Sequence, residues 1–433
     1  MDTGRSDAGD GLLSQQAVGR AGSFSQLVRR RWVAVIATTI LMAGYLMVSF
    51  IVVPAVTHSG WQYSEDLWIN YQLAHTIQFG NYANVYSQSS LRPTPAILLT
   101  LLPVEQLTQH LGLSTGFPFE IPRPTAWPVV APFIVLLSAP ALFAADSVAE
   151  LIGATWQRRM VVGVFGAIAL GSVLWWGHPE DALAVAFLLF AMRAAIRRHW
   201  ILCAWLLGVG IAFQALIVLA VPVVVLGAGW RRLPSLVLRI VAPAAALLLI
   251  PFATDWSDTF RAVVEQPVFP RFVRPTVWMH FAPHLSKELS FGGPSVAEGP
   301  IRMISIVIAI WVGVWFMQRE RSPRMLVWCV ALVLSLRVLV EPGLAPYYAW
   351  PPMAVALVSA AMQPSKRLWL TCGMVVGVTW LANYQIHTGW LWWPIATGLI
   401  VVLATAFPAE RHRDGQAVEG TDSEVDANVL SEA

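Results

Sequence analysis

The stretch from Arg29 to Val56, RRRWVAVIATTILMAGYLMVSFIVVPAV, decides the fold class of this chain. Three arginines precede an uncharged apolar run that is long enough to cross a lipid bilayer as a helix. The run is too long for the core of a signal peptide and has no small-residue cleavage site, which predicts an uncleaved first transmembrane helix. Because positive residues collect on the cytoplasmic side of a membrane, the arginines place the amino terminus in the cytoplasm.

The composition of the whole chain agrees with this first helix. Of the 433 residues, 57% are hydrophobic and only 12% are charged, and the mean hydropathy is +0.61. Soluble domains carry about 25% charged residues, so this chain has about half of the usual solvating surface. The composition indicates a polytopic membrane protein and excludes a cytosolic enzyme, a disordered chain and a nucleic-acid-binding protein. The net charge of +3 is too small to imply a polyanionic partner.

Short basic connections set the predicted topology. Placing each cluster of Arg and Lys in the cytoplasm gives an all-α fold of about 12 transmembrane helices with both termini inside. The predicted spans are approximately 33–56, 128–152, 160–176, 181–196, 200–214, 215–229, 235–252, 300–318, 325–341, 347–363, 368–384 and 391–408.

Two segments leave alternatives open. Residues 95–113 are apolar enough to span, but they fit the charge pattern better as a re-entrant or interfacial helix. Residues 200–229 form either two spans or one long span. The predicted polytopic domain covers 29–409, between disordered cytoplasmic tails at 1–28 and 410–433. The predicted location is the cell inner (plasma) membrane.

Three regions remain on the predicted outer face, at about 57–127, 177–181 and 253–299. A channel or a simple scaffold does not need so large a first loop, so this loop is the first indication of function. It begins with the carboxylate pair Glu65-Asp66, which precedes an amphipathic segment. A carboxylate at the water–lipid boundary can take a proton from a hydroxyl group. The alternative interpretation is that one of the pair caps the following helix.

The turn of the second region concentrates ionisable groups in His178, Glu180 and Asp181. Carboxylates at a membrane boundary are costly and therefore indicate a functional site, which here would bind and orient a substrate or bind a divalent cation. Alternatively, the two acids only begin the next helix favourably. Three adjacent side chains do not converge easily on one ion, so neither a metal site nor a cofactor is predicted.

Arginines in the later regions are candidates for binding a phosphate group. Arg261 and Arg274 lie in the third outer region, and a guanidinium group matches phosphate with two parallel hydrogen bonds. Arg337 lies inside an apolar span four residues before Glu341, so the two share a helix face, either as a structural ion pair or as part of a phosphate site. Interfacial belts explain most aromatic residues near the outer helix ends, while sugar stacking explains one or two.

Three parts of the sequence resemble GT-C glycosyltransferases, and in particular actinobacterial polyprenyl-phosphate-mannose-dependent mannosyltransferases. The resembling residues are Asp66-Leu67-Trp68-Ile69, Ala74, Gly80, Val85-Tyr86, Pro93-Thr94-Pro95 and Leu101-Leu102-Pro103 in the first loop, then Leu207 to Gln214 with Pro222, and finally Glu341-Pro342 with Pro346 to Pro351. The resemblance implies that Asp66 is the general base, with Glu65 beside it, and that Tyr347 and Tyr348 lie beside the lipid donor.

These observations together predict a hexosyltransferase. It would move a sugar from a polyprenyl-phosphate donor to a lipid-linked or polymeric cell-envelope glycan on the outer face of the membrane. Membrane lipids would surround the enzyme. The transfer would invert the configuration at the anomeric carbon. The choice of mannose comes from the resemblance alone. Two alternatives stay open, namely a transporter or flippase of lipid-linked glycans and a non-catalytic GT-C relative.

Overall fold

The computed structural model describes most of the chain. The described residues are 30–52, 65–78, 82, 85–86, 94–114, 125–260, 263, 268–270, 276–281, 284–289, 293–296, 299–319, 322–383 and 389–408. The two tails that the sequence predicts to be disordered lie outside these residues.

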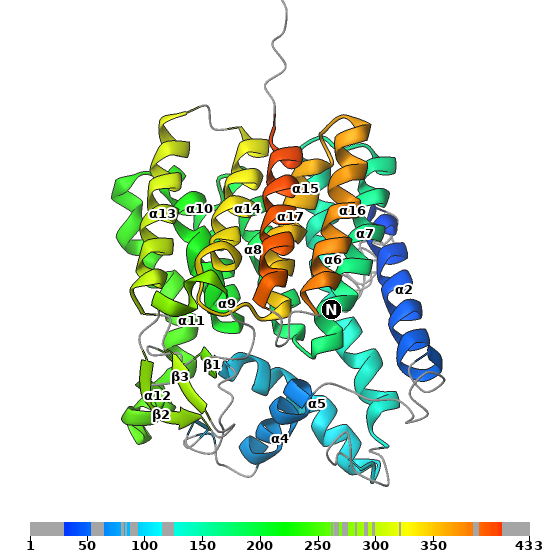
Figure 1. Ribbon diagram of the computed structural model, residues 1–433, viewed down its shortest axis with the longest axis vertical. Coiled ribbons are helices and arrows are strands. Elements are labelled where there is room, and N and C mark those ends of the chain that lie inside the picture. Colours follow the sequence, from blue (N-terminus) through cyan, green and yellow to red (C-terminus); the bar gives the residue numbers. More distant parts are fainter. Residues whose placement is uncertain are drawn as a thin grey trace, which may run out of the picture.

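Most of the described residues belong to a helical bundle (Figure 1). Its helices are α2 (Trp32–Met47, continued by a π-helical turn, Val48–Val52), α6 (Trp127–Leu151), α7 (Trp156–Trp176), α8 (Pro179–Ile196), α9 (Trp200–Phe213), α10 (Val221–Val225, between 3-10 turns at Ala215–Ala220 and Leu226–Ala228), α11 (Leu233–Thr254, after a 3-10 turn at Trp230–Arg232), α13 (Gly299–Gln318), α14 (Pro323–Val340), α15 (Trp350–Ala360, after a 3-10 turn at Pro346–Ala349), α16 (Ser365–Ala382) and α17 (Trp392–Ala406, after a 3-10 turn at Gly389–Leu391).

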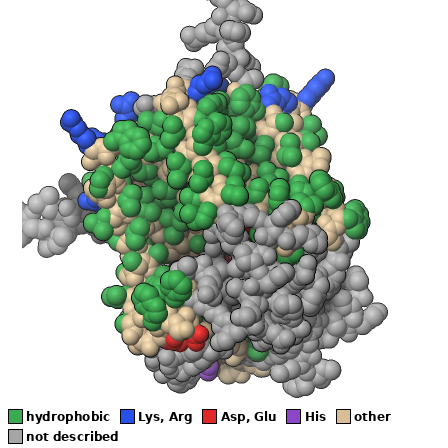
Figure 2. Space-filling view, turned by 60° about the vertical axis from the view of Figure 1, so that its left-hand side comes forward, with side chains coloured by type: hydrophobic (Ala, Val, Ile, Leu, Met, Phe, Trp, Pro, Cys, Tyr) green, Lys and Arg blue, Asp and Glu red, His purple; other side chains and the backbone are tan. Residues whose placement is uncertain are grey.

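The surface of the bundle suits a lipid bilayer. Six helices of the described part are long and apolar enough to cross a membrane, and three more are apolar but shorter. Hydrophobic side chains cover the face of the bundle in Figure 2, and Lys and Arg side chains gather along one end of it. A helix satisfies its own backbone hydrogen bonds, which is what spanning hydrocarbon requires. The protein is therefore membrane-embedded.

The helices run alternately in opposite directions. Arg158, in the first turn of α7, donates a 3.1 Å hydrogen bond to the carbonyl oxygen of Ala361, just after α15. At the other end of α7, Trp176 donates to Asn383, just after α16, over 2.7 Å. Each span that the sequence predicts overlaps one helical segment of the bundle. The helices thus lie where they were predicted, while the number that crosses the membrane stays a prediction.

The segment 200–229 is broken rather than continuous. Helix α9 ends at Phe213, and Gln214 adopts an extended conformation with φ −150° and ψ 115°. The chain then turns back through the 3-10 turns around α10, so that Gly227 faces the ring of Trp200 at the start of α9. The structure therefore favours two segments over the single long span.

Helices α4 (Glu65–Gln78) and α5 (Pro95–His110) lie together at one end of the bundle, here called the loop end (Figure 1). The buried Tyr71 of α4 donates a 3.2 Å hydrogen bond to the carbonyl oxygen of Val104 in α5. His75 contacts the buried carboxylate of Glu105 over 2.6 Å. Helix α5 thus packs on α4 and does not run through the bundle, as expected for residues 95–113.

The third loop region contains a small sheet that the all-α prediction missed. The strands β1 (Val268–Pro270), β2 (His284–Leu289) and β3 (Gly293–Val296) form an antiparallel sheet in the order β1-β3-β2. The sheet lies at the loop end beside the short helix α12 (Trp256–Phe260), as Figure 1 shows. Strands this short carry too little alternation of polar and apolar residues to stand out against the long helical runs.

A buried charge cluster joins three helices at the opposite end, here called the basic end. Asp146 of α6 accepts hydrogen bonds from Arg31 over 2.9 Å and from Arg159 of α7 over 2.6 Å. Glu150, one turn further along α6, lies 2.6 Å from Arg31. A buried carboxylate is stable only when it is paired, so this cluster fixes α2 and α7 against α6.

Replacing Asp146 by Asn should destabilise the bundle. The substitution leaves two buried arginines without their shared carboxylate, which costs about 3–5 kcal/mol. The thermal unfolding midpoint in detergent measures the effect. The matched control is Glu150→Gln, whose side chain is 28% exposed and whose loss should cost no more than about 1 kcal/mol. Equal midpoints for the two variants would contradict the role given to Asp146.

Helices α9 and α11 approach each other closely at Gly208. A Cβ atom on Gly208 would lie 2.5 Å from the carbonyl oxygen of Ile240 and 2.9 Å from the ring of Pro243. Gly208→Ala should therefore force the helices apart and cost about 1–3 kcal/mol, seen as a lower unfolding midpoint. Gly44→Ala is the control, because a Cβ atom there meets nothing within 4 Å. A Gly208→Ala protein as stable as the Gly44→Ala protein would refute the close contact.

Candidate functional site

A histidine joins the loop end to the bundle. His178 lies between α7 and α8, and its Nε2 atom is 2.9 Å from a carboxylate oxygen of Asp66 in α4. Its Nδ1 atom is 2.6 Å from Glu180 in the first turn of α8. The side chains of His178 and Asp66 are only 12% and 18% exposed. Three residues that the sequence singled out in two separate regions therefore form one chain of contacts.

The two carboxylates keep the imidazole charged. Burial by itself lowers the pKa of His178, but the negative charge of Glu180 and the hydrogen bonds to Asp66 and Glu180 raise it more strongly, to about 10. At neutral pH His178 is therefore an imidazolium that donates a hydrogen bond from each ring nitrogen. Asp66 and Glu180 are its anionic partners.

The local sequence explains why His178 stands at this point. Helix α7 ends at Gly177, whose φ of 77° lies in the left-handed region that favours glycine. Pro179 then occupies the first position of α8, where its missing N–H costs nothing. The chain therefore changes direction at His178, whose side chain contacts Asp66 of α4.

Two carboxylate oxygens beside His178 are buried without a partner. Asp181, which is only 1% exposed, accepts a 2.7 Å hydrogen bond from the side-chain amide of Gln214 through one oxygen. Its other oxygen and one oxygen of Glu180 have no hydrogen-bond partner among the described residues. Buried oxygens of this kind are costly unless a donor reaches them, and a ligand with hydroxyl groups supplies such donors.

Arg337 near the end of α14 and two tyrosines in the 3-10 turn Pro346–Ala349 also belong to the surroundings of His178. The ring of Tyr347 lies against His178 with 3.6 Å between ring centroids. The guanidinium of Arg337 lies 3.7 Å from the centre of the Tyr348 ring and donates a 2.9 Å hydrogen bond to Glu341. The charge of Arg337 also acts on Asp181. This group therefore belongs to the same site as His178.

The third loop region contacts this site from the side. Thr276 donates a 2.6 Å hydrogen bond to the carbonyl oxygen of Glu341. The indole N–H of Trp278 donates to the carbonyl oxygen of Leu339 over 2.6 Å. The end of α14, which carries Arg337 and Glu341, is thus held by the region that follows α12.

The structure brings together most of the residues that the sequence proposed. Those that meet at the loop end are Asp66, His178, Glu180, Asp181, Arg337, Glu341, Tyr347 and Tyr348. Arg261, Arg274 and the side chain of Glu65 lie outside the described residues. Gln214 was not among the predicted site residues, although its amide inside the apolar stretch 200–229 was a usable signal.

The two interpretations of Asp66 and of the 178–181 turn are compatible. Asp66 and both acids of the turn lie in the first turns of α4 and α8, where negative charge is favourable. The same side chains contact His178 or Gln214, so they do more than stabilise helix ends. Arg337 and Glu341 form the predicted ion pair, and it lies within the site.

The chemical capacity of the site follows from its groups. Within the described part of the chain, no cluster of three or more His, Cys, Asp or Glu side chains is arranged to hold a metal ion. Four carboxylates face two cations and two tyrosine rings. Such a set binds a polyhydroxylated ligand, offers a base to one of its hydroxyl groups and provides aromatic faces for stacking.

Comparison with known proteins gives no family. No family model matches the chain, and no curated protein is found to be similar to it. The assignment of a function therefore depends on the residues of the site and on the resemblance described above.

The charged state of His178 predicts a dependence of stability on pH. The pKa of His178 in the folded protein is about 10, above its usual 6.5. Its ion pairs therefore stabilise the fold fully below pH 6.5, and this contribution is lost as the pH rises through about 10. His178→Gln should lower the unfolding midpoint strongly near neutral pH, and the difference from wild type should shrink as the pH approaches 10.

The control for this experiment is a second histidine, at the opposite end of α8. His199 follows α8, is exposed, and forms no side-chain hydrogen bond with the described residues. His199→Gln should leave the midpoint unchanged at every pH. A difference between wild type and His178→Gln that stays constant with pH would contradict the charged imidazole.

Proposed function

We propose that this protein is a membrane glycosyltransferase that moves a sugar from a polyprenyl-phosphate donor to a lipid-linked or polymeric glycan. One observation carries the proposal. The acid that follows the first helix, Asp66, lies in one site with His178, Asp181 and Arg337, although these residues come from three separate regions of the sequence. The GT-C family and mannose as the sugar rest on the resemblance of the sequence.

The proposed topology puts this site on the outer face of the inner (plasma) membrane. Cytoplasmic ends of membrane proteins are enriched in Lys and Arg, and Figure 2 shows these residues gathered at the end away from α4 and α5. With the basic end inside and about 12 crossings, both termini are cytoplasmic. A lipid-linked donor then reaches the site from the bilayer, so no nucleotide sugar has to cross the membrane.

The proposed reaction is a direct displacement. The acceptor hydroxyl gives its proton to the Asp66 carboxylate while its oxygen forms a bond to the anomeric carbon of the donor sugar. The bond between that carbon and the phosphate oxygen breaks, and its electron pair leaves with the polyprenyl phosphate. One displacement inverts the anomeric centre. A β-linked donor therefore gives an α-linked product.

The neighbours of Asp66 have distinct roles in this scheme. His178 is a positioning residue, because its two hydrogen bonds fix the carboxylate of Asp66 relative to α8. The unpartnered oxygens of Glu180 and Asp181 accept hydrogen bonds from sugar hydroxyls. Tyr347 and Tyr348 offer aromatic faces to the sugar or to the first part of the lipid.

Positive charge has to meet the leaving phosphate. Arg337 is the described arginine at the site, and its pairing with Glu341 keeps the guanidinium in place. Arg261 and Arg274 of the third loop region are further candidates, and described residues of that region contact the end of α14 through Thr276 and Trp278. Fixed guanidinium groups stabilise charge where it develops in the transition state.

The test is a transfer assay with purified protein, radiolabelled polyprenyl-phosphate mannose and a crude lipid-glycan acceptor extract. Asp66→Asn keeps the size and hydrogen-bonding capacity of the side chain but removes the base, so transfer should fall by about 10²–10⁴-fold. The matched control is Asp258→Asn, the same change in α12 at the loop end, which should leave transfer unchanged.

The other outcomes decide between the remaining functions. Equal transfer by wild type and Asp66→Asn would remove Asp66 as the base. If wild type transfers no sugar from any polyprenyl-phosphate donor but moves lipid-linked glycans across vesicle membranes, the protein is a transporter and the proposal fails.

A further inference from the structure

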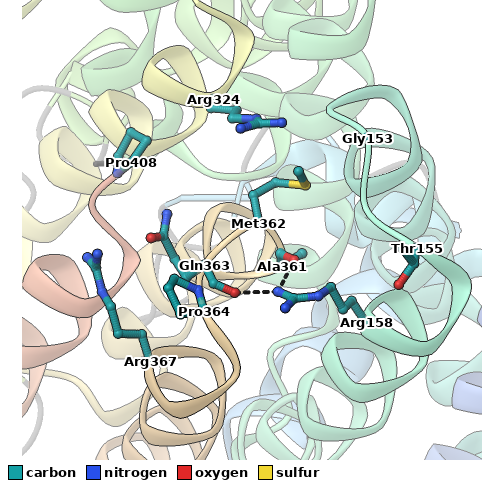
Figure 3. Close-up of a pocket in the computed structure, with 10 residues that line it drawn as sticks. All are labelled: Gly153, Thr155, Arg158, Arg324, Ala361, Met362, Gln363, Pro364, Arg367 and Pro408. Atoms are coloured by element: carbon teal, nitrogen blue, oxygen red, sulfur yellow. Dashed lines mark hydrogen bonds between the residues drawn. The ribbon is translucent and has the colours of Figure 1, made fainter. Parts of the chain in front are cut away.

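A polar cavity lies at the basic end, away from the proposed catalytic site. Its volume is about 340 Å³. Its lining includes Arg158, Arg324, Arg367, Ala361 and Gln363, as Figure 3 shows. Among the described residues, the lining includes three arginines and no acidic residue. Neither the catalytic scheme nor the resemblance to glycosyltransferases gives this cavity a role.

Each arginine comes from the first turn of a different helix. Arg158 is the third residue of α7, Arg324 the second of α14 and Arg367 the third of α16. The amino ends of these helices therefore meet around one cavity. Their backbone dipoles add positive potential at the cavity, while the carboxyl ends of α15 and α17, which also reach it, offset part of that potential. The three guanidinium groups therefore supply most of the attraction for an anion.

Two of the arginines are held in place by the backbone. Arg158 donates through Nη1 to the carbonyl oxygens of Ala361 and Gln363, as the dashed lines in Figure 3 show. Arg367 donates through Nη2 to the carbonyl oxygens of Ala404 and Phe407, both over 2.8 Å. In both groups the other guanidinium nitrogens have no hydrogen-bond partner among the described residues.

Arg324 has fewer described contacts than Arg158 and Arg367. Within the part of the chain that the structure describes, it forms neither a hydrogen bond nor an ion pair, and its side chain is directed over the cavity opposite Arg158 (Figure 3). In the Asp146 cluster, by contrast, Arg31 and Arg159 have carboxylate partners. The three arginines of the cavity thus carry positive charge that no described acid neutralises.

We propose that this cavity binds a phosphate group. Arginine recognises phosphate with paired hydrogen bonds, and two of these guanidinium groups are already oriented by their backbone contacts. Basic pockets between transmembrane helices on the cytoplasmic side bind the headgroups of anionic phospholipids. The phosphate belongs to such a headgroup or to a soluble phosphate compound, and two ligands distinguish these sources.

The experiment uses the purified full-length protein in detergent with phosphatidylcholine. In one arm phosphatidylglycerol is added, and in the other sodium phosphate, each against a sodium chloride control of equal ionic strength. A ligand that binds the folded state raises the unfolding midpoint, so the midpoint as a function of ligand concentration gives an apparent dissociation constant.

The variants are chosen to leave the fold intact. Arg324→Gln removes one exposed charge without breaking a described contact, and Arg324→Glu reverses it. In the absence of ligand each should unfold at or above the wild-type midpoint, because the change relieves repulsion among the cavity arginines. Arg231→Gln is the control, because Arg231 is exposed near the start of α11 and does not line the cavity.

The apparent dissociation constant should rise about fivefold for Arg324→Gln and more for Arg324→Glu, since each cation near an anionic ligand contributes about 1 kcal/mol. Arg231→Gln should behave as wild type. This pattern with phosphatidylglycerol alone identifies a lipid headgroup, and the same pattern with sodium phosphate identifies a soluble phosphate. If all variants match wild type in both arms, the cavity is not a phosphate site and the proposal is overturned.

Discussion

The imidazolium of His178 is the contact on which the arrangement of the site depends. Without it, three carboxylates would lie close together at a poorly hydrated boundary, where like charges repel and their ionised forms are costly. With it, Asp66 from the loop end and Glu180 from the bundle share one cation. The position of α4 relative to α8 is therefore set by electrostatics, in addition to the packing of α4 on α5.

The same physical rule operates at the basic end with the signs reversed. There a single buried carboxylate, Asp146, lies between Arg31 and Arg159 and ties α2, α6 and α7 together. In a bundle with an apolar surface, the hydrophobic effect does little to choose between neighbouring helices. Charged side chains at the helix ends, together with close contacts at small residues such as Gly208, supply that choice.

Much of this structure could be predicted from the sequence, including the Arg337–Glu341 pair one helical turn apart, but its contacts between distant residues could not. Apolar length and basic connections located the helices of the bundle, because both signals are local. Ionisable residues in the predicted outer regions also identified Asp66 and His178 as separate candidates. The contact between these two side chains depends on where α4 lies relative to the turn between α7 and α8. The spacing of residues along the chain does not encode that position. The small sheet was missed because its strands are short, and Gln214 because its partner Asp181 lies thirty-three positions away.

The two ends differ in a way that the positive-inside rule alone does not explain. That rule requires only that cations lie on the cytoplasmic side, and exposed residues such as Arg231 satisfy it. It does not require three arginines around a cavity of about 340 Å³. Concentrating unneutralised charge there costs repulsion, which a bound anion removes. Among the described residues of the site at the loop end, acidic groups outnumber cations, and hydroxyl groups can satisfy the unpartnered oxygens of Glu180 and Asp181. The ligands proposed for the two ends therefore differ in chemistry, with hydroxyl groups at the loop end and a phosphate at the basic end.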